Sequence, residues 1–126
     1  MTTDLERALD DKTAPWTEIE YRTKSFWIFR DAYPVTQGHL LFVPTQVTTE
    51  CLMSCYKAAY NFGYDGIERE HWQGFNVGQN VGQAAGQTVM YPHVHMIPRR
   101  DGDMEDPRGG VRHVIPSKGN YKIGNS

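Results

Sequence analysis

The sequence predicts an α+β domain in which a five-stranded antiparallel sheet is backed by one long helix. Short segments rich in β-forming residues follow one another along the chain, and a single long stretch repeats apolar residues at helical spacing. Strands and helices do not alternate, so no part of the pattern requires a parallel sheet. An antiparallel sheet with one covering helix is therefore expected.

The length and composition fit one folded domain. The chain has 126 residues, of which 39% are hydrophobic and 22% charged, a balance typical of globular proteins. We expect a single domain over residues 1–126, with a helix and connector over 1–15 and a C-terminal loop or tail over 101–126. The net charge of −2 does not favour nucleic-acid binding. No membrane-spanning run or signal peptide is visible, which favours a cytoplasmic protein.

The first part of the chain is expected to form a short helix and three strands. Thr3 and Glu6 have the spacing of a capping box, which predicts a helix up to about residue 10. Alternating or wholly apolar β-forming residues then predict strands at 17–22, 26–29 and 39–44.

The long helix is expected to begin at Thr48 or Thr49, either of which can cap it. Gly66 is predicted to lie just beyond its C-terminus. Cys51 and Cys55 lie one helical turn apart and are expected to be reduced residues of the buried side.

The remaining strands are predicted on either side of a glycine-rich loop with glycines at 78, 82 and 86. Phe75 and Val77 indicate a fourth strand, and a fifth is expected within residues 86–99. Beyond these, residues 111–116 are predicted to be a short extended segment.

The stretch before and within the fifth strand holds the candidate functional residues. Side chains two apart on a strand share a face, so Tyr91, His93 and His95 are expected on one side. Val94 and Met96 would fill the other side. The glycine-rich loop offers backbone N–H donors next to the two imidazoles, a combination that suits an anion, most simply a phosphate.

These motifs together resemble the histidine triad (HIT) family, closest to its diadenosine polyphosphate hydrolase and Fhit-like branch. The resemblance runs from about residue 26 to residue 112. It rests on Gly86-Gln87-Thr88-Val89, on His93-x-His95, and on the upstream Pro34-Val35-Thr36-Gln37-Gly38-His39.

The resemblance implies roles for individual residues. His93 matches the family's nucleophile, and His95 matches the histidine that contacts the phosphate. Tyr91 takes the place of the first histidine, which supports the site. The other implied residues are His39 as the additional histidine, Asp31 for the ribose, Asn80, Gln87 and Thr88 for phosphate oxygens, and Phe26 and Phe29 near the base pocket.

The chemistry of imidazole agrees with such a role. A neutral histidine is a competent nucleophile near pH 7, and a backbone carbonyl that holds Nδ1–H leaves Nε2 free to attack. The resemblance then implies cleavage at the α-phosphate of a nucleoside polyphosphate, a dinucleoside polyphosphate or a phosphoramidate, through a nucleotidyl-histidine intermediate. No cofactor is required, although Mg²⁺ is compatible with a polyphosphate substrate. The family also implies a homodimer.

Two other functions remain open from the residues. A phenol does not carry a proton near neutral pH as imidazole does, so Tyr91 also fits a nucleotide-binding protein of low activity. If Tyr91 limits catalysis, Tyr91→His is expected to raise the rate. Alternatively, His39, His93 and His95 could ligate the metal of a metal-dependent hydrolase, although no metal site is expected here.

Overall fold

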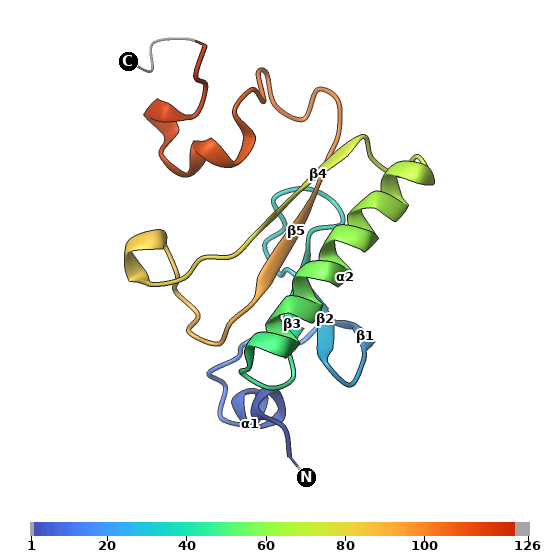
Figure 1. Ribbon diagram of the computed structural model, residues 1–126, viewed down its shortest axis with the longest axis vertical. Coiled ribbons are helices and arrows are strands. Elements are labelled where there is room, and N and C mark those ends of the chain that lie inside the picture. The colour runs from blue at the N-terminus through green and yellow to red at the C-terminus, as the bar shows by residue number, and fades with distance from the viewer. Residues whose placement is uncertain (1, 123–126) are drawn as a thin grey trace.

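The computed structural model describes residues 2–122, and a five-stranded antiparallel sheet forms its centre, as predicted (Figure 1). The strand order is β1-β2-β3-β5-β4. The helix α2, Thr49–Glu68, lies across one face of this sheet (Figure 1). The strands are β1 (Ile19–Arg22), β2 (Phe26–Arg30), β3 (Leu40–Pro44), β4 (Gly74–Gly78) and β5 (Val94–Arg99).

The main core lies between α2 and the sheet. Thr48 caps the helix, because its side chain accepts a hydrogen bond from the backbone N–H of Cys51. Cys55 is a free, fully buried thiol, and burial raises its pKa to about 12. Val94 and Met96 point from β5 into this core, as the strand pattern predicted. The alternate residues of β5 are therefore presented on the opposite face of the sheet.

The prediction that Gly66 follows the end of α2 is wrong, because the helix continues to Glu68. Gly66 is instead a buried packing residue. An added Cβ there would lie 2.0 Å from the ring of Trp72, and a Cβ at Gly63 would lie 2.4 Å from the ring of Phe75. The two glycines thus let aromatic rings pack directly on the helix backbone.

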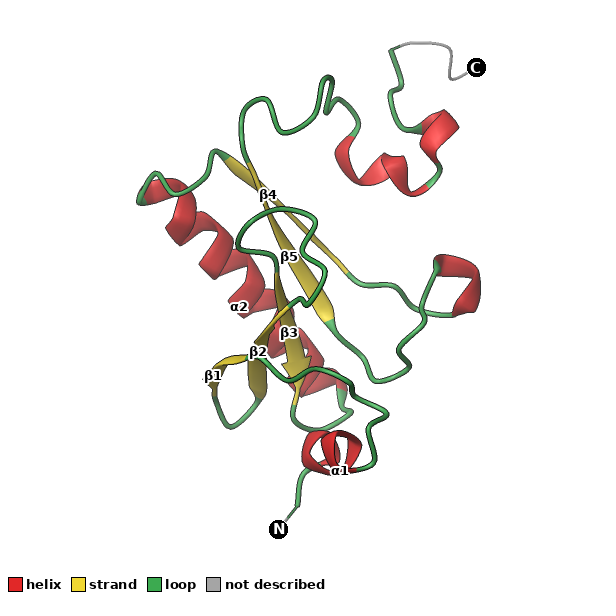
Figure 2. Cartoon of the chain, turned by 180° about the vertical axis from the view of Figure 1, so that it is seen from behind, coloured by secondary structure: helices red, strands yellow, loops and turns green. Residues whose placement is uncertain are grey.

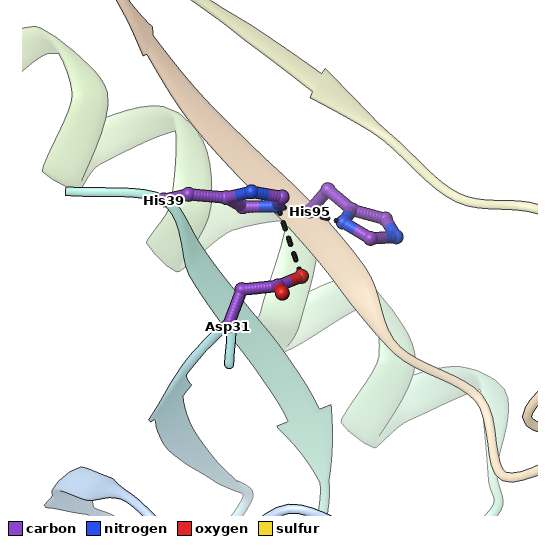
Figure 3. A group of neighbouring side chains, drawn as sticks. All are labelled: Asp31, His39 and His95. Atoms are coloured by element: carbon purple, nitrogen blue, oxygen red, sulfur yellow. Dashed lines mark hydrogen bonds and ion pairs between the residues drawn. The ribbon is translucent and has the colours of Figure 1, made fainter. Parts of the chain in front are cut away.

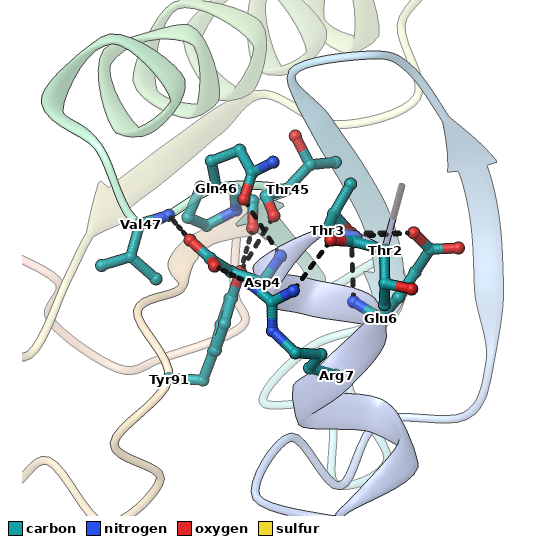
Figure 4. A network of polar contacts seen from close by, with 10 residues as sticks. Thr2, Thr3, Asp4, Glu6, Arg7, Thr45, Gln46, Val47 and Tyr91 are labelled. Carbon is teal, nitrogen blue, oxygen red and sulfur yellow. Dashed lines mark hydrogen bonds and ion pairs between the residues drawn. The ribbon is translucent and has the colours of Figure 1, made fainter.

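The N-terminal helix α1, Asp4–Asp10, begins with the predicted capping box of Thr3 and Glu6. It packs against the sheet face that α2 leaves free, where Leu5 joins a second core cluster with Phe29 and Tyr91. Figure 4 shows how polar contacts fix α1 to the loop after β3, where Asp4 accepts a hydrogen bond from the N–H of Val47 at 2.8 Å.

The C-terminal segment over residues 111–116 is not the short extended segment that was predicted. Residues Gly110–Val114 form the 3₁₀ turn η2, followed by η3 at Pro116–Lys118. Gly109 and Gly110 precede and open this turn with φ of +99° and +52°, conformations that favour glycine. Figure 2 shows this segment to the side of β4, opposite α2 and far from α1.

Neither helix among residues 2–122 combines the length and the apolar composition that crossing a bilayer requires.

Candidate active site

A cavity of about 460 Å³ lies on the sheet face opposite α2. It is bounded by the segment before β1, the end of β2 and the glycine loop that contains the 3₁₀ turn η1, Gln83–Ala85. The cavity brings together six residues that the sequence had indicated: Asp31, Asn80, Gln87, Thr88, His93 and His95.

His93 is held by the backbone two residues earlier. Its Nδ1 lies 2.9 Å from the carbonyl oxygen of Tyr91. A carbonyl only accepts, so Nδ1 carries the proton and donates it. The neutral ring then has an unprotonated Nε2, which is the nitrogen able to attack an electrophile. His93 is half-buried and lines the cavity, so its ring borders the space that a substrate would occupy.

A chain of hydrogen bonds sets the proton positions on the other two histidines (Figure 3). The backbone N–H of Val35 donates to Nδ1 of His39 at 3.1 Å, which leaves the His39 proton on Nε2. That nitrogen lies 2.9 Å from Nδ1 of His95 and donates to it. His95 therefore carries its own proton on Nε2, where it can donate to a bound anion.

Burial keeps these two histidines neutral near pH 7. Burial is the largest of the causes, with the neighbouring His93 and His39, that together lower the pKa of His95 to about 4 against the opposing effect of Asp31. Burial also lowers the pKa of His39, again against the effect of Asp31. The carboxylate of Asp31 lies 3.4 Å from Nε2 of His39. Asp31, His39 and His95 each offer one possible metal-ligand atom, and these atoms lie within 4.8 Å of one another. This group could therefore also hold a metal ion.

The side chain of Tyr91 does not reach the cavity, in contrast to the prediction that it supports the phosphate site. Its ring is buried under α1, and its hydroxyl donates to the carbonyl of Pro44 at 2.6 Å (Figure 4). Burial raises the pKa of this phenol. The reason is that β5 begins only at Val94, so the strict alternation of the strand does not extend back through Pro92. Tyr91 supports His93 through its carbonyl oxygen instead.

Gln87 lines the cavity, but its carboxamide is occupied with the loop itself. The side-chain oxygen accepts from the N–H of Gly82 at 2.8 Å, and the amino group donates to the carbonyls of Val89 and Met90, both at 3.1 Å. Gln87 thus shapes the loop. Asn80 and Thr88 are exposed side chains at the cavity, open to a ligand.

The structure does not bring Phe26 to the site. Its side chain is on the α2 side of the sheet, with its ring centroid 6.1 Å from that of Phe42. Phe29 is on the correct face but fully buried. The aromatic that lines the cavity is Trp16, whose ring centroid lies 5.7 Å from Phe29 and 4.9 Å from His93. Trp16 is not among the residues that the sequence motifs indicated. Its only signal was an aromatic residue directly before the first strand.

The fold and the site define an α+β domain in which a carbonyl-held histidine faces a cavity beside a glycine-rich loop. A family model described as the HIT domain matches residues 16–102 of the chain. The chain belongs to the HIT family.

Curated relatives include proteins of known and unknown activity. An uncharacterized HIT-like protein of Methanocaldococcus jannaschii is 29% identical over 77% of this chain and 81% of its own length. The AP-4-A phosphorylase of Mycobacterium tuberculosis is 33% identical over 65% of this chain, which spans only 46% of that protein. The bis(5'-adenosyl)-triphosphatase of Dictyostelium discoideum is 29% identical over 73% of this chain and 69% of its own length.

Solved structures give the same family. A Zn-bound histidine triad family protein from Mycobacterium smegmatis superimposes with a TM-score of 0.66 at 29% identity. The match covers 79% of this chain and 76% of that one.

Proposed function

We propose that the protein is a nucleotide hydrolase or transferase that acts at the α-phosphate of a nucleoside polyphosphate, a dinucleoside polyphosphate or a phosphoramidate. The observation that carries this proposal is the hydrogen bond from His93 Nδ1 to the Tyr91 carbonyl, which leaves Nε2 free at the cavity. Membership of the HIT family supports a nucleotide hydrolase or transferase in general terms. Relatives named as a phosphorylase and a triphosphatase of adenosyl polyphosphates support the substrate class.

The proposed reaction has two steps. Nε2 of His93 attacks the α-phosphorus, a new N–P bond forms, and the bond to the leaving oxygen or nitrogen breaks with its electron pair. Water, or another acceptor, then displaces His93 and releases the nucleoside monophosphate. His95 donates its Nε2–H to the developing negative charge, and amide groups of the glycine loop and of Asn80 add further donors.

Other parts of the cavity fit the rest of a nucleotide. Asp31 lines it at the end of β2 and is proposed to bind the ribose hydroxyls. Trp16 is the aromatic surface available to a base, and Phe29 lies behind it. No bound cofactor is needed for this chemistry, because the nucleophile and the donors all come from the chain. Mg²⁺ would enter with a polyphosphate substrate.

Rapid mixing of the protein with a labelled dinucleoside polyphosphate tests the proposal. We expect an acid-labile labelled protein to form before the monophosphate appears. His93→Ala should abolish the labelled species and reduce turnover by at least about 10³-fold. The matched control is His71→Ala, which changes an exposed histidine outside the cavity.

Two outcomes would favour the other functions. Tight nucleotide binding without a labelled intermediate would favour a binding protein. Activity that survives in His93→Ala but disappears with a chelator would favour a metal-dependent hydrolase at Asp31, His39 and His95.

A further inference from the structure

The loop that joins β2 to β3, residues 31–39, closes around the side chain of His39. The backbone N–H of Asp31 donates to the carbonyl of His39 at 3.2 Å, and the N–H of His39 donates to the carbonyl of Thr36, also at 3.2 Å. Within this loop the N–H of Val35 reaches Nδ1 of the same histidine at 3.1 Å. The conformation of the loop therefore decides whether His39 meets a donor at Nδ1.

The same loop also places a carboxylate beside the other nitrogen of His39. The backbone N–H of Tyr33 donates to Oδ1 of Asp31 at 2.8 Å, and the second carboxylate oxygen lies 3.4 Å from Nε2 of His39 (Figure 3). A carboxylate accepts hydrogen bonds, so it favours a proton on Nε2, and the Val35 N–H disfavours a proton on Nδ1. Both contacts select the tautomer in which His39 donates to His95.

Little apolar burial holds this loop closed. Residues 32–35 and 37–38 are all exposed. A segment with few buried contacts opens at a low free-energy cost unless other bonds fasten it. Two hydrogen bonds to the end of β5, one from each side, provide that fastening.

The first of these bonds comes from Thr36, a half-buried residue whose hydroxyl donates to the carbonyl of Pro98 at 2.6 Å. The carbonyl of Arg99 accepts from the N–H of Gln73, on the β4 side, so the preceding carbonyl points to the β3 side. The pairing of β3 with β5 ends at Leu40, and no strand residue meets that carbonyl. Thr36 supplies the hydrogen bond that a longer β3 would make.

The second bond comes from Arg100. Its Nη1 donates to the carbonyl of Gln37 at 2.9 Å, and its guanidinium carbon lies 5.9 Å from the ring centroid of Trp72. The next loop residue, Gly38, has a φ of +93°, and an added Cβ there would lie 3.2 Å from the Pro98 side chain. Two neighbouring loop residues are thus tied to the end of β5.

We propose that Thr36 and Arg100 are positioning residues, which hold the 31–39 loop closed and thereby keep the proton of His95 on Nε2. Neither lines the candidate active-site cavity, so both act through Val35 and His39. In an open loop the hydrogen bond between the two histidines can run in either direction. In the reversed direction His95 donates from Nδ1, and its Nε2 has no proton to offer an anion.

Histidine tautomers can be measured by two-bond proton–nitrogen NMR spectra of isotope-labelled protein at about pH 7.5, where free histidine is neutral. The wild-type protein should give His39 and His95 each as a single Nε2–H tautomer. Thr36→Val removes the hydroxyl at nearly constant volume and should give mixed tautomers of His95. It should also lower the exchange protection of the Val35 amide at least about tenfold. Thr36→Ser keeps the hydroxyl and should restore both properties.

Thr23→Val is the matched control, because the Thr23 hydroxyl donates to the carbonyl of Phe26 at 2.7 Å in the turn between β1 and β2, outside the cavity. It should leave His95 in one tautomer. His93, held by the Tyr91 carbonyl, should keep its Nδ1–H form in every variant.

Arg100→Met loosens the same loop at the surface, and its effect on the tautomers of His95 decides the question if Thr36→Val does not fold. A single Nε2–H tautomer of His95 in the folded variants, or mixed tautomers already in the wild-type protein, would overturn the proposal.

Turnover separates this proposal from the proposed function, on which only its kinetic consequence rests. With a dinucleoside polyphosphate, Thr36→Val should lower kcat at least about threefold and change KM by less than about twofold, because fewer molecules carry the donor proton. Mixed tautomers in Thr36→Val of a protein without turnover would retain the positioning role and overturn the enzymatic function. Full turnover with a single tautomer in Thr36→Val would retain the function and overturn the positioning role.

Discussion

At the scale of single residues, the backbone sets the chemistry of the site. The Tyr91 carbonyl fixes the tautomer of His93, and the Val35 N–H fixes that of His39 and, through it, that of His95. These hydrogen bonds decide which ring nitrogen attacks and which one donates. Two of them come from backbone groups, the Tyr91 carbonyl and the Val35 N–H, which a side-chain motif does not record.

Stability should depend on pH through the buried histidines. The pKa of His95 is about 4 in the folded chain against an ordinary value of 6.5, so the unfolded chain binds more protons between these values. The contribution of His95 is therefore complete above pH 6.5 and is lost as the pH falls from 6.5 to about 4. Urea denaturation at pH 7, 5.5 and 4 should show this decline. His95→Gln should flatten it, whereas His71→Gln should not.

The buried Tyr91 gives a second prediction at this scale. Tyr91→Phe removes the hydrogen bond to the Pro44 carbonyl and should lower the free energy of unfolding by about 1–2 kcal/mol. Tyr91→His should also destabilise, because a smaller polar ring would replace one packed in the α1 cluster. We expect no gain in rate, in contrast to the expectation from sequence. Chemical denaturation measures the stability of the two variants, and steady-state assays measure their rates. Tyr21→Phe, at an exposed tyrosine, is the control. A faster Tyr91→His enzyme would contradict this account.

At the scale of elements, α2 joins the sheet through close backbone contact. The ring of Trp72 lies on Gly66, and its indole N–H donates to the carbonyl of Gly63 at 2.9 Å. The two glycines lower the helix propensity of α2, and the dense packing at the end of the helix offsets this cost.

Gly66→Ala tests this contact. Alanine would gain about 1 kcal/mol of helix propensity, but its Cβ would overlap the Trp72 ring, and overpacking typically costs 1–3 kcal/mol. We expect a net loss of stability in thermal or urea unfolding. Asn61→Ala, at an exposed position of the same helix, should be neutral or slightly stabilising. Combining Gly66→Ala with Trp72→Leu should show strong coupling. Additive effects of the two changes would refute the overlap.

Most helices and strands could be predicted from local sequence patterns. The features that these patterns did not predict depend on contacts between residues far apart in the sequence. The capping box at Thr3 and the alternation at Val94 and Met96 depend on neighbours in sequence, and both predictions are confirmed. The role of Gly66 depends on Trp72 folding back over it, which no local signal contains. The 3₁₀ turns after Gly109 likewise replaced a predicted extended segment.

The candidate site divides in the same way. The glycine loop and the histidines could be identified from their order along the chain. The side of the sheet on which Phe26 lies depends on the register of β2 with β3, and Trp16 reaches the cavity from a segment before the first strand. Such placements follow from tertiary structure and were not visible in the motif.

At the scale of the whole molecule, the sheet has two free edges, β1 and β4. We expect a homodimer through the β4 side, because an unpaired edge strand there lies beside exposed aromatic residues. The exposed residues are Tyr60 and Tyr64 of α2, whose rings contact each other and the half-buried ring of Phe75 on β4. Light scattering after gel filtration should give twice the mass of the chain. Tyr64→Glu should shift it toward the monomer, and Tyr21→Glu, on the opposite edge, should not. A monomeric wild-type protein would rule the dimer out.

The packing of α1 against Tyr91 has a further consequence. The helix lies outside residues 16–102, the part of the chain shared with the family model, yet Leu5 packs in one cluster with Tyr91, whose carbonyl orients His93. A substitution in α1 can therefore change the position of the Tyr91 carbonyl, and with it the reactivity of His93, while every motif residue stays the same.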